Sequence, residues 1–256
     1  SSLYLAKGNL PMFPECLSTG PFSLRARTRT AAWSIWAELT SEGELGDHGI
    51  QRSWVQPTYR LSYDDADELI ELAPLEDTDL AELDALLSRR RECRVRNGAL
   101  LMDLPEGRIR CREGQPSLEV SEPGRSRQMV AEAMILAGAV VARFAEVHDL
   151  ALPFRSQLTA ELPPRSELEA LPDGAVRFAA IKRCLSRGLM GTQPSAHFSL
   201  GLASYAQATS PIRRYGDLVV QRQLQAQLNG EEPLNRDAMQ LLITDFDAAV
   251  REGIGI

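Results

Sequence analysis

The stretch QATSPIRRYGDL, residues 207–218, combines the features of a helix start with two adjacent cations. Ser210 is a residue type that commonly caps a helix. Pro211 suits the first helical position, where its missing N–H costs no hydrogen bond. Arg213 and Arg214 would then lie in the first turn, where the positive end of the helix dipole disfavours cations. A helix that opens in this way requires an explanation.

Two explanations fit these residues. Asp217 follows Arg213 by four positions and Arg214 by three, so its carboxylate could neutralise the arginines on the helix surface. Alternatively, an anion binds there, because free N–H groups at a helix N-terminus and the planar guanidinium of arginine both suit phosphate. Thr209 and Ser210 add hydroxyl groups at the same place. The residues themselves leave both explanations open.

The composition is that of a soluble globular protein large enough for one sizeable domain. Of the 256 residues, 44% are hydrophobic and 25% are charged, and the formal net charge is −7. That negative charge argues against a protein whose entire surface binds nucleic acid. Residues 61–88 carry ten acids and no Lys or Arg, as a solvated helix face would, whereas residues 177–222 carry seven bases and one acid. The second segment can steer an anionic substrate locally.

Cysteine usage and hydropathy indicate in which cellular compartment the protein works. The four cysteines form no CxxC pair and lie far apart, which predicts reduced thiols and a cytoplasmic protein. The three histidines show no zinc-binding spacing. The longest apolar run, AMILAGAVVA at 133–142, is too short to cross a bilayer, so we expect a buried helix and no membrane partner. The sequence does not fix the oligomeric state, and a monomer is the expectation.

Hydrophobic periodicity predicts an α+β domain in which strands precede helices. Residues 31–63 alternate as strands do, and the helical period begins at Asp64. Short strand-like pieces follow over 95–122, and loops with a short helix over 150–175. Long helices are predicted over 125–149, 175–187, 209–229 and 235–252.

Motifs along nearly the whole chain resemble the ribonuclease II (RNB) family of hydrolytic 3′-to-5′ exoribonucleases, in the family's order. They are YLAKGNLPMFPECLSTGPFSL (4–24), RLSYDDADELIE (60–71), VAEAMILAGAVVA (130–142), AHFSLGLASYA (196–206) and SYAQATSPIRRYGDLVVQRQL (204–224). The resemblance implies that residues 1–256 are a portion of the RNB catalytic domain, an antiparallel β-sheet packed with long helices. No separate oligonucleotide-binding barrel is expected.

The resemblance also implies an activity. The family degrades single-stranded RNA to nucleoside 5′-monophosphates by Mg²⁺-assisted hydrolysis of the terminal phosphodiester. Arg213 matches the catalytic arginine that contacts the scissile phosphate and stabilises its growing charge. Arg214, Thr209 and Ser210 are then supporting RNA-binding residues. The missing anion at the helix start would be the terminal phosphate of the RNA.

Two tyrosines match RNA-binding positions of the family. Tyr63 matches a tyrosine near the last nucleotide that helps to distinguish ribose from deoxyribose. From its local sequence alone, it could equally be a half-buried aromatic at the end of a strand. Tyr4 matches an aromatic that stacks on a base near the end of the RNA, and its alternative is a flexible terminal residue.

Other positions depart from the family pattern. Met102 stands where an aromatic would complete a base stack. Ala131 replaces the first acid of a Glu-Glu pair, which removes a sugar contact and leaves Glu132, and Gly138 replaces an asparagine. A late glutamate that contacts RNA in the family has no assigned counterpart within 252–256.

The metal ligands of the family lie in an aspartate motif upstream of the segment with which this chain begins. We therefore expect the N-terminal part of the domain to be missing, and no residue of this chain is assigned to Mg²⁺. DDADE at 64–68 is interpreted as an acidic helix start. Either the chain is a piece of a nuclease with its aspartates elsewhere, or it is a metal-free relative that binds RNA or a partner. The first is favoured, because a phosphate-binding motif is hard to justify if phosphate never arrives.

Overall fold

The structure is a computed structural model that describes residues 1–5, 8–76, 78–101, 105–112, 115–121 and 124–254. Its first half contains β1 (Leu3–Leu5), β2 (Gly8–Leu10), α1 (Glu15–Ser18), β3 (Thr30–Leu39), β4 (Leu45–Val55), α2 (Tyr63–Leu72), α3 (Asp79–Arg96), β5 (Glu106–Arg112) and β6 (Gln115–Ser121). Its second half contains α4 (Arg125–Val147), β7 (Phe154–Ser156), α5 (Arg165–Ala170), α6 (Ala175–Cys184), β8 (Leu189–Gly191), the 3₁₀ turn η1 (Phe198–Leu200), α7 (Tyr215–Asn229) and α8 (Arg236–Ile254).

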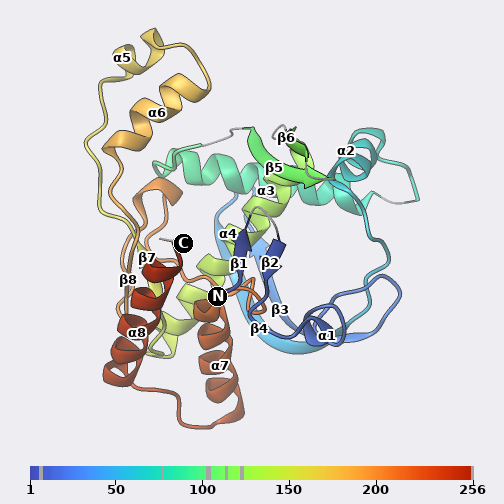
Figure 1. The fold of residues 1–256 in the computed structure, drawn as a ribbon, viewed down its shortest axis with the longest axis vertical. Helices are drawn as coiled ribbons and strands as arrows, with labels where there is room; N and C mark the ends of the chain where they lie inside the picture. The colour runs from blue at the N-terminus through green and yellow to red at the C-terminus, as the bar shows by residue number, and fades with distance from the viewer. Residues whose placement is uncertain (6–7, 77, 102–104, 113–114, 122–123, 255–256) are drawn as a thin grey trace.

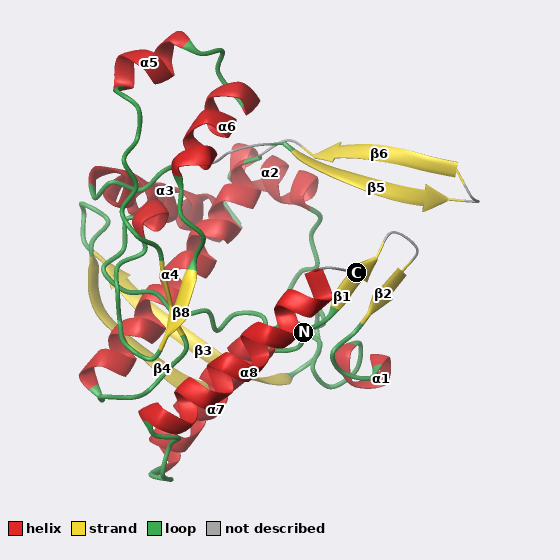
Figure 2. Ribbon diagram, turned by 60° about the vertical axis from the view of Figure 1, so that its left-hand side comes forward, coloured by secondary structure: helices red, strands yellow, loops and turns green. Residues whose placement is uncertain are grey.

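The predicted α+β class is confirmed, with a different arrangement of the strands. Within the described residues, the strands pair antiparallel as four separate two-stranded sheets, β1–β2, β3–β4, β5–β6 and β7–β8. Figure 1 shows α4 beside the β3–β4 hairpin, and Figure 2 shows the β5–β6 hairpin and the α5–α6 pair extending from the body. The helices therefore build most of the core.

The β3–β4 hairpin follows from the alternation in the sequence. Trp33 and Ile35 lie on one face of β3 and pack against the core, where Ile35 pairs with Ile50 of β4. The strand prediction fails for 58–63, where no strand forms. Ser62 instead caps α2, because its hydroxyl accepts the Asp65 N–H and the Asp65 carboxylate accepts the Ser62 N–H.

The core is centred on α4, which passes through the middle of the molecule in Figure 1. Val140 and Val141 are fully buried and belong to the same cluster as Phe154 of β7 and Leu224 of α7. The prediction that the apolar run 133–142 forms a helix is confirmed, and residues 138–142 of that run are buried. None of the described helices is both long and apolar enough to span a membrane.

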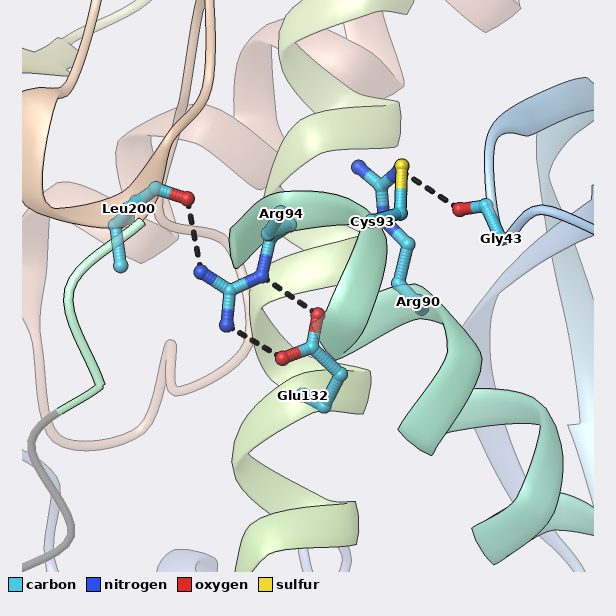
Figure 3. Close-up of polar contacts among 6 residues, drawn as sticks. All are labelled: Gly43, Arg90, Cys93, Arg94, Glu132 and Leu200. Atoms are coloured by element: carbon cyan, nitrogen blue, oxygen red, sulfur yellow. Dashed lines mark hydrogen bonds and ion pairs between the residues drawn. The ribbon is translucent and has the colours of Figure 1, made fainter. Parts of the chain in front are cut away.

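A buried ion pair joins three segments on the α3 side of α4, as Figure 3 shows. The Arg94 guanidinium donates to both carboxylate oxygens of Glu132, at 2.7 and 2.5 Å, and to the Leu200 carbonyl at 2.8 Å. Both charged side chains are almost completely buried, so the pair satisfies charges that would otherwise be costly in the core. Glu132, the remaining acid of the Glu-Glu pair, thus holds Arg94, and the Arg94–Glu132 pair links α3, α4 and η1.

Gly138 allows the chain after η1 to approach α4 closely. A Cβ built at this position would lie 2.2 Å from a Tyr205 ring carbon and 2.7 Å from the Ala206 carbonyl oxygen. The Ala206 N–H also donates to the Gly138 carbonyl at 3.3 Å. The glycine that replaces an asparagine of the family pattern therefore has a packing role.

We predict that Gly138→Ala destabilises the protein by about 2 kcal/mol, because overpacking outweighs the roughly 1 kcal/mol that alanine gains in helix propensity. Urea unfolding measures the change. Gly191→Ala is the matched control, because a Cβ there meets no atom within 4 Å. Equal stabilities of the two variants would contradict the packing role of Gly138.

Candidate functional site

The turn that carries Arg213 precedes α7 and is not part of it. The predicted helix start at Ser210 is wrong, because α7 begins at Tyr215 with Arg214 as its N-cap residue. The N–H groups of Arg213 and Arg214 both donate to the Ser210 carbonyl, at 3.2 and 2.9 Å. The physical reason lies in Asp217, whose carboxylate accepts the Ser210 N–H at 2.8 Å and so holds Ser210 outside the helix.

Asp217 is the anchor of this turn. Its side chain is 2% exposed, and the oxygen that accepts the Ser210 N–H also accepts a hydrogen bond from the Arg214 guanidinium at 2.7 Å. The same nitrogen of Arg214 approaches the Thr209 hydroxyl at 3.4 Å. Asp217 therefore neutralises Arg214, and the explanation by an internal ion pair is correct for that arginine alone.

Arg213 is oriented differently. Its side chain is exposed and makes no hydrogen bond or ion pair with any other described residue. Its backbone is fixed, because its carbonyl accepts the Ser2 N–H at 2.9 Å. A rigid turn thus presents a guanidinium whose donors are available, so the explanation by a bound anion still stands for Arg213.

A groove of about 660 Å³ lies beside this guanidinium. One wall comes from the turn and includes Thr209, Ser210 and Arg213, and the facing walls come from the loop around α1 and from β3. Phe22 and Trp33 contribute aromatic rings to these walls. The groove combines apolar surface with hydroxyls and one cation, a combination that suits a ligand with an apolar ring and a phosphate.

Tyr4 is close to the turn through the N-terminal segment. Ser2 binds the Arg213 carbonyl, and the Ser2 hydroxyl accepts the Met12 N–H at 2.9 Å, which fixes β1 and β2 beside the start of α7. Tyr4 lies in β1, opposite Asn9, with 63% of its surface exposed. It belongs to a strand, which argues against the flexible alternative, and its ring is accessible for stacking.

Tyr63 is the first residue of α2 rather than the end of a strand. Its carbonyl accepts the Ser126 hydroxyl at 3.0 Å, and the Arg127 guanidinium lies 4.1 Å from the centre of its ring. A cation over the ring stabilises that orientation. Tyr63 is 39% exposed, and the contacts that fix it come from α4, away from the Arg213 turn. No local sequence pattern indicated the contact of Arg127 with Tyr63.

Two of the acids at 64–68, Asp65 and Asp67, act as helix caps. Asp65 pairs with Ser62, whose hydroxyl lowers the pKa of that carboxyl. Asp67 accepts the Ser126 N–H at 2.6 Å and so caps α4 from a different helix. Among the described residues, no group of three or more His, Cys, Asp or Glu side chains could hold a metal ion. The part of the chain that the structure describes therefore does not fit a pair of Mg²⁺ ions.

Two titratable side chains lie behind the turn, and burial favours their neutral forms. Burial raises the pKa of the Tyr205 hydroxyl and lowers the pKa of His197, and the two rings pack edge to face. Met102, which stands where an aromatic would complete a base stack, lies outside the described residues. The expectation that residues 252–256 hold no assigned counterpart of the late family glutamate stays a prediction.

Comparison with protein families and curated sequences gives close matches. The RNB domain model matches residues 1–230. An uncharacterized ribonuclease of Synechocystis is 42% identical over 245 residues, which are 95% of this chain and 37% of that protein. A chloroplastic/mitochondrial ribonuclease II of Arabidopsis thaliana is 33% identical over 237 residues, 90% of this chain and 29% of that protein. The chain thus spans 29–37% of the length of these two relatives.

Solved structures share the fold. Mycoplasma genitalium RNase R in complex with ribose-methylated single-stranded RNA superposes with a TM-score of 0.79 at 20% identity, over 99% of this chain and 48% of that one. Yeast Ssd1, described as a pseudonuclease, superposes with a TM-score of 0.71 at 18% identity, over 94% of this chain and 34% of that one.

We predict that Asp217→Asn lowers the free energy of unfolding by about 1–3 kcal/mol, because the buried Ser210 N–H and the half-buried Arg214 guanidinium lose a charged acceptor. Urea unfolding measures this change. Asp64→Asn, at an exposed position of α2, should stay within about 0.5 kcal/mol of the parent protein. If the two variants were equally stable, Asp217 would not be the anchor of the turn.

Proposed function

This chain belongs to the RNB domain family, and we propose that it is the phosphate-binding portion of a hydrolytic 3′-to-5′ exoribonuclease. The proposed substrate is single-stranded RNA, and the proposed products are nucleoside 5′-monophosphates. The observation that supports this proposal best is the contrast between two neighbouring arginines. Arg214 is neutralised internally by Asp217, whereas Arg213 is exposed beside a groove with its donors available.

The chemistry of the turn suits a phosphodiester. In hydrolysis, water attacks the phosphorus, the bond to the 3′-oxygen of the preceding nucleotide breaks, and negative charge grows on the phosphate oxygens. The planar guanidinium of Arg213 can donate two parallel hydrogen bonds to those oxygens and stabilise that charge. Its backbone is held by Ser2 and its neighbour by Asp217, so the reorganisation on phosphate binding is confined to the Arg213 side chain.

We assign no residue of the Arg213 turn to the metal ions that hydrolysis would require. Because the described residues offer no acidic cluster, we propose that Mg²⁺ ions and their aspartate ligands are supplied by residues outside the described ones. The relatives are longer than this chain, which is compatible with such an arrangement. The cytoplasmic location and the monomeric state stay predictions.

A second candidate function is RNA binding without cleavage. The absence of an acidic cluster among the described residues favours it, and a pseudonuclease carries the same fold. A 5′-labelled single-stranded RNA, incubated with this chain in Mg²⁺ or in EDTA and resolved on a sequencing gel, separates the two. Mg²⁺-dependent shortening from the 3′ end supports the nuclease. Bound but intact RNA supports the second function, and the absence of salt-sensitive RNA binding would rule out both.

We predict that Arg213→Ala lowers the single-turnover rate of RNA trimming about 100- to 1,000-fold, because a transition-state contact is lost. RNA affinity, which depends on many contacts, should fall much less. Arg222→Ala, at an exposed position of α7, is the control and should change neither quantity. An equal loss of rate and affinity would mean that Arg213 only binds the RNA.

We predict that Tyr63→Ala reduces the preference for RNA over DNA, because the ring fixed by Arg127 would no longer contact the ribose. Fluorescence anisotropy with RNA and DNA of the same base sequence measures that preference. Tyr4→Ala removes an exposed stacking ring and should weaken both ligands similarly, by about tenfold. An unchanged preference in Tyr63→Ala would leave Tyr63 with a purely structural role.

A further inference from the structure

We propose that the open end of the β3–β4 hairpin is an additional binding surface for single-stranded RNA, separate from the Arg213 turn. This arginine surface consists of Arg25, Arg27, Arg29, Arg52, Arg60 and Trp54. The inference rests on the proposed function, because it takes RNA as the polyanion that binds to the arginine surface. It extends that function to nucleotides upstream of the 3′ end.

The first argument is the distribution of charge. Residues 16–37 and 48–63 contain no Asp or Glu, although the chain has a net charge of −7. All five arginines of the arginine surface lie in these two segments and are exposed. The acids of the hairpin, Glu38, Glu42, Glu44 and Asp47, lie around its turn, at the opposite end of the strands. The open end is therefore a local concentration of positive charge.

The structure brings the two acid-free segments together. The Arg27 N–H donates to the Pro57 carbonyl at 2.7 Å, which ties the loop before β3 to the loop after β4. Ala31 lies opposite Trp54 in the hairpin, so the strands enter these loops side by side. Figure 1 shows the connection from β4 to α2 rising past the loop that follows α1. The arginines thus come from both segments to one end of the hairpin.

Trp54 adds the aromatic component. It is 64% exposed, and the Arg29 guanidinium lies 5.1 Å from the centre of its ring. Arg52, two residues earlier on β4, projects from the same face of the strand. Surfaces that bind single-stranded nucleic acid combine cations that follow the phosphates with aromatic rings on which bases stack. The arginine surface presents both groups.

The groove connects this surface to the Arg213 turn. Leu24 and Ala31, which flank the loop carrying Arg25, Arg27 and Arg29, line the groove, and Arg213 lines it as well. An RNA whose terminal phosphodiester contacts Arg213 can therefore pass along the groove and reach the arginine surface. Long RNAs would contact both places, whereas very short ones would contact only the turn.

The test uses the full chain, EDTA to prevent cleavage, and fluorescence anisotropy with 5′-labelled oligouridines of about 4 and about 16 nucleotides. The test variant is the triple substitution Arg25→Gln, Arg29→Gln and Arg52→Gln. The matched control, Arg143→Gln with Arg165→Gln and Arg236→Gln, removes the same charge from arginines paired with Glu146, Glu169 and Asp149. Trp54→Ala is a second test variant that leaves the charge unchanged.

We expect the test variant to bind the long RNA at least about tenfold more weakly, and the salt slope of log affinity to flatten by about 2 for three lost phosphate contacts. Trp54→Ala should weaken the long RNA about tenfold. The short RNA should bind both test variants as it binds the parent chain.

Three results would overturn the inference while leaving the proposed function intact: unchanged binding of the long RNA, an equal loss in the matched control, or an equal loss for the short RNA. If the parent chain bound neither RNA at low salt, the proposed function itself would fail.

Discussion

The arrangement of the candidate site depends on one buried carboxylate. Asp217 lies in the first turn of α7 with almost no solvent contact, and a charge in that position is stable only if it is paired and hydrogen-bonded. One oxygen of Asp217 accepts the Ser210 N–H and the Arg214 guanidinium. These bonds hold Ser210 outside the helix and pair the Arg214 guanidinium with the Asp217 carboxylate. The chain then presents Arg213 to solvent beside the groove, which makes that arginine the best candidate for a phosphate ligand.

The segment that leads into this turn is fixed by α4. The buried Arg94–Glu132 pair attaches η1 to α3 and α4, and the absence of a side chain at Gly138 lets Tyr205 pack directly on α4. At the other end of α4, Ser126 binds the Tyr63 carbonyl, and Arg127 covers the Tyr63 ring. One central helix thus positions both the turn and the tyrosine that we assign to the ribose.

Local sequence patterns predicted the elements whose structure depends mainly on the periodicity of their own hydrophobic residues. The alternation of Trp33 and Ile35 predicts the hairpin, and the apolar run 133–142 predicts the central helix. At α7 they misplaced only the start, because Ser210 and Pro211 have the composition of a helix start while Asp217 imposes a turn. The contact of Ser2 with Arg213 and the stacking of Arg29 on Trp54 join residues that are distant in sequence, so no periodicity could indicate them. For the site itself, the family resemblance predicts Arg213, and the structure adds that Arg214 is paired with Asp217 whereas Arg213 is exposed.

The central claim is that Arg213 binds RNA phosphate while Arg214 stays paired with Asp217. A high-resolution crystal structure of this chain with a short single-stranded RNA tests it most directly. The account predicts a phosphate oxygen within hydrogen-bonding distance of the Arg213 guanidinium, with the Arg214–Asp217 pair intact. Phosphate bound to Arg214 with that pair broken, or RNA bound away from the turn, would contradict it.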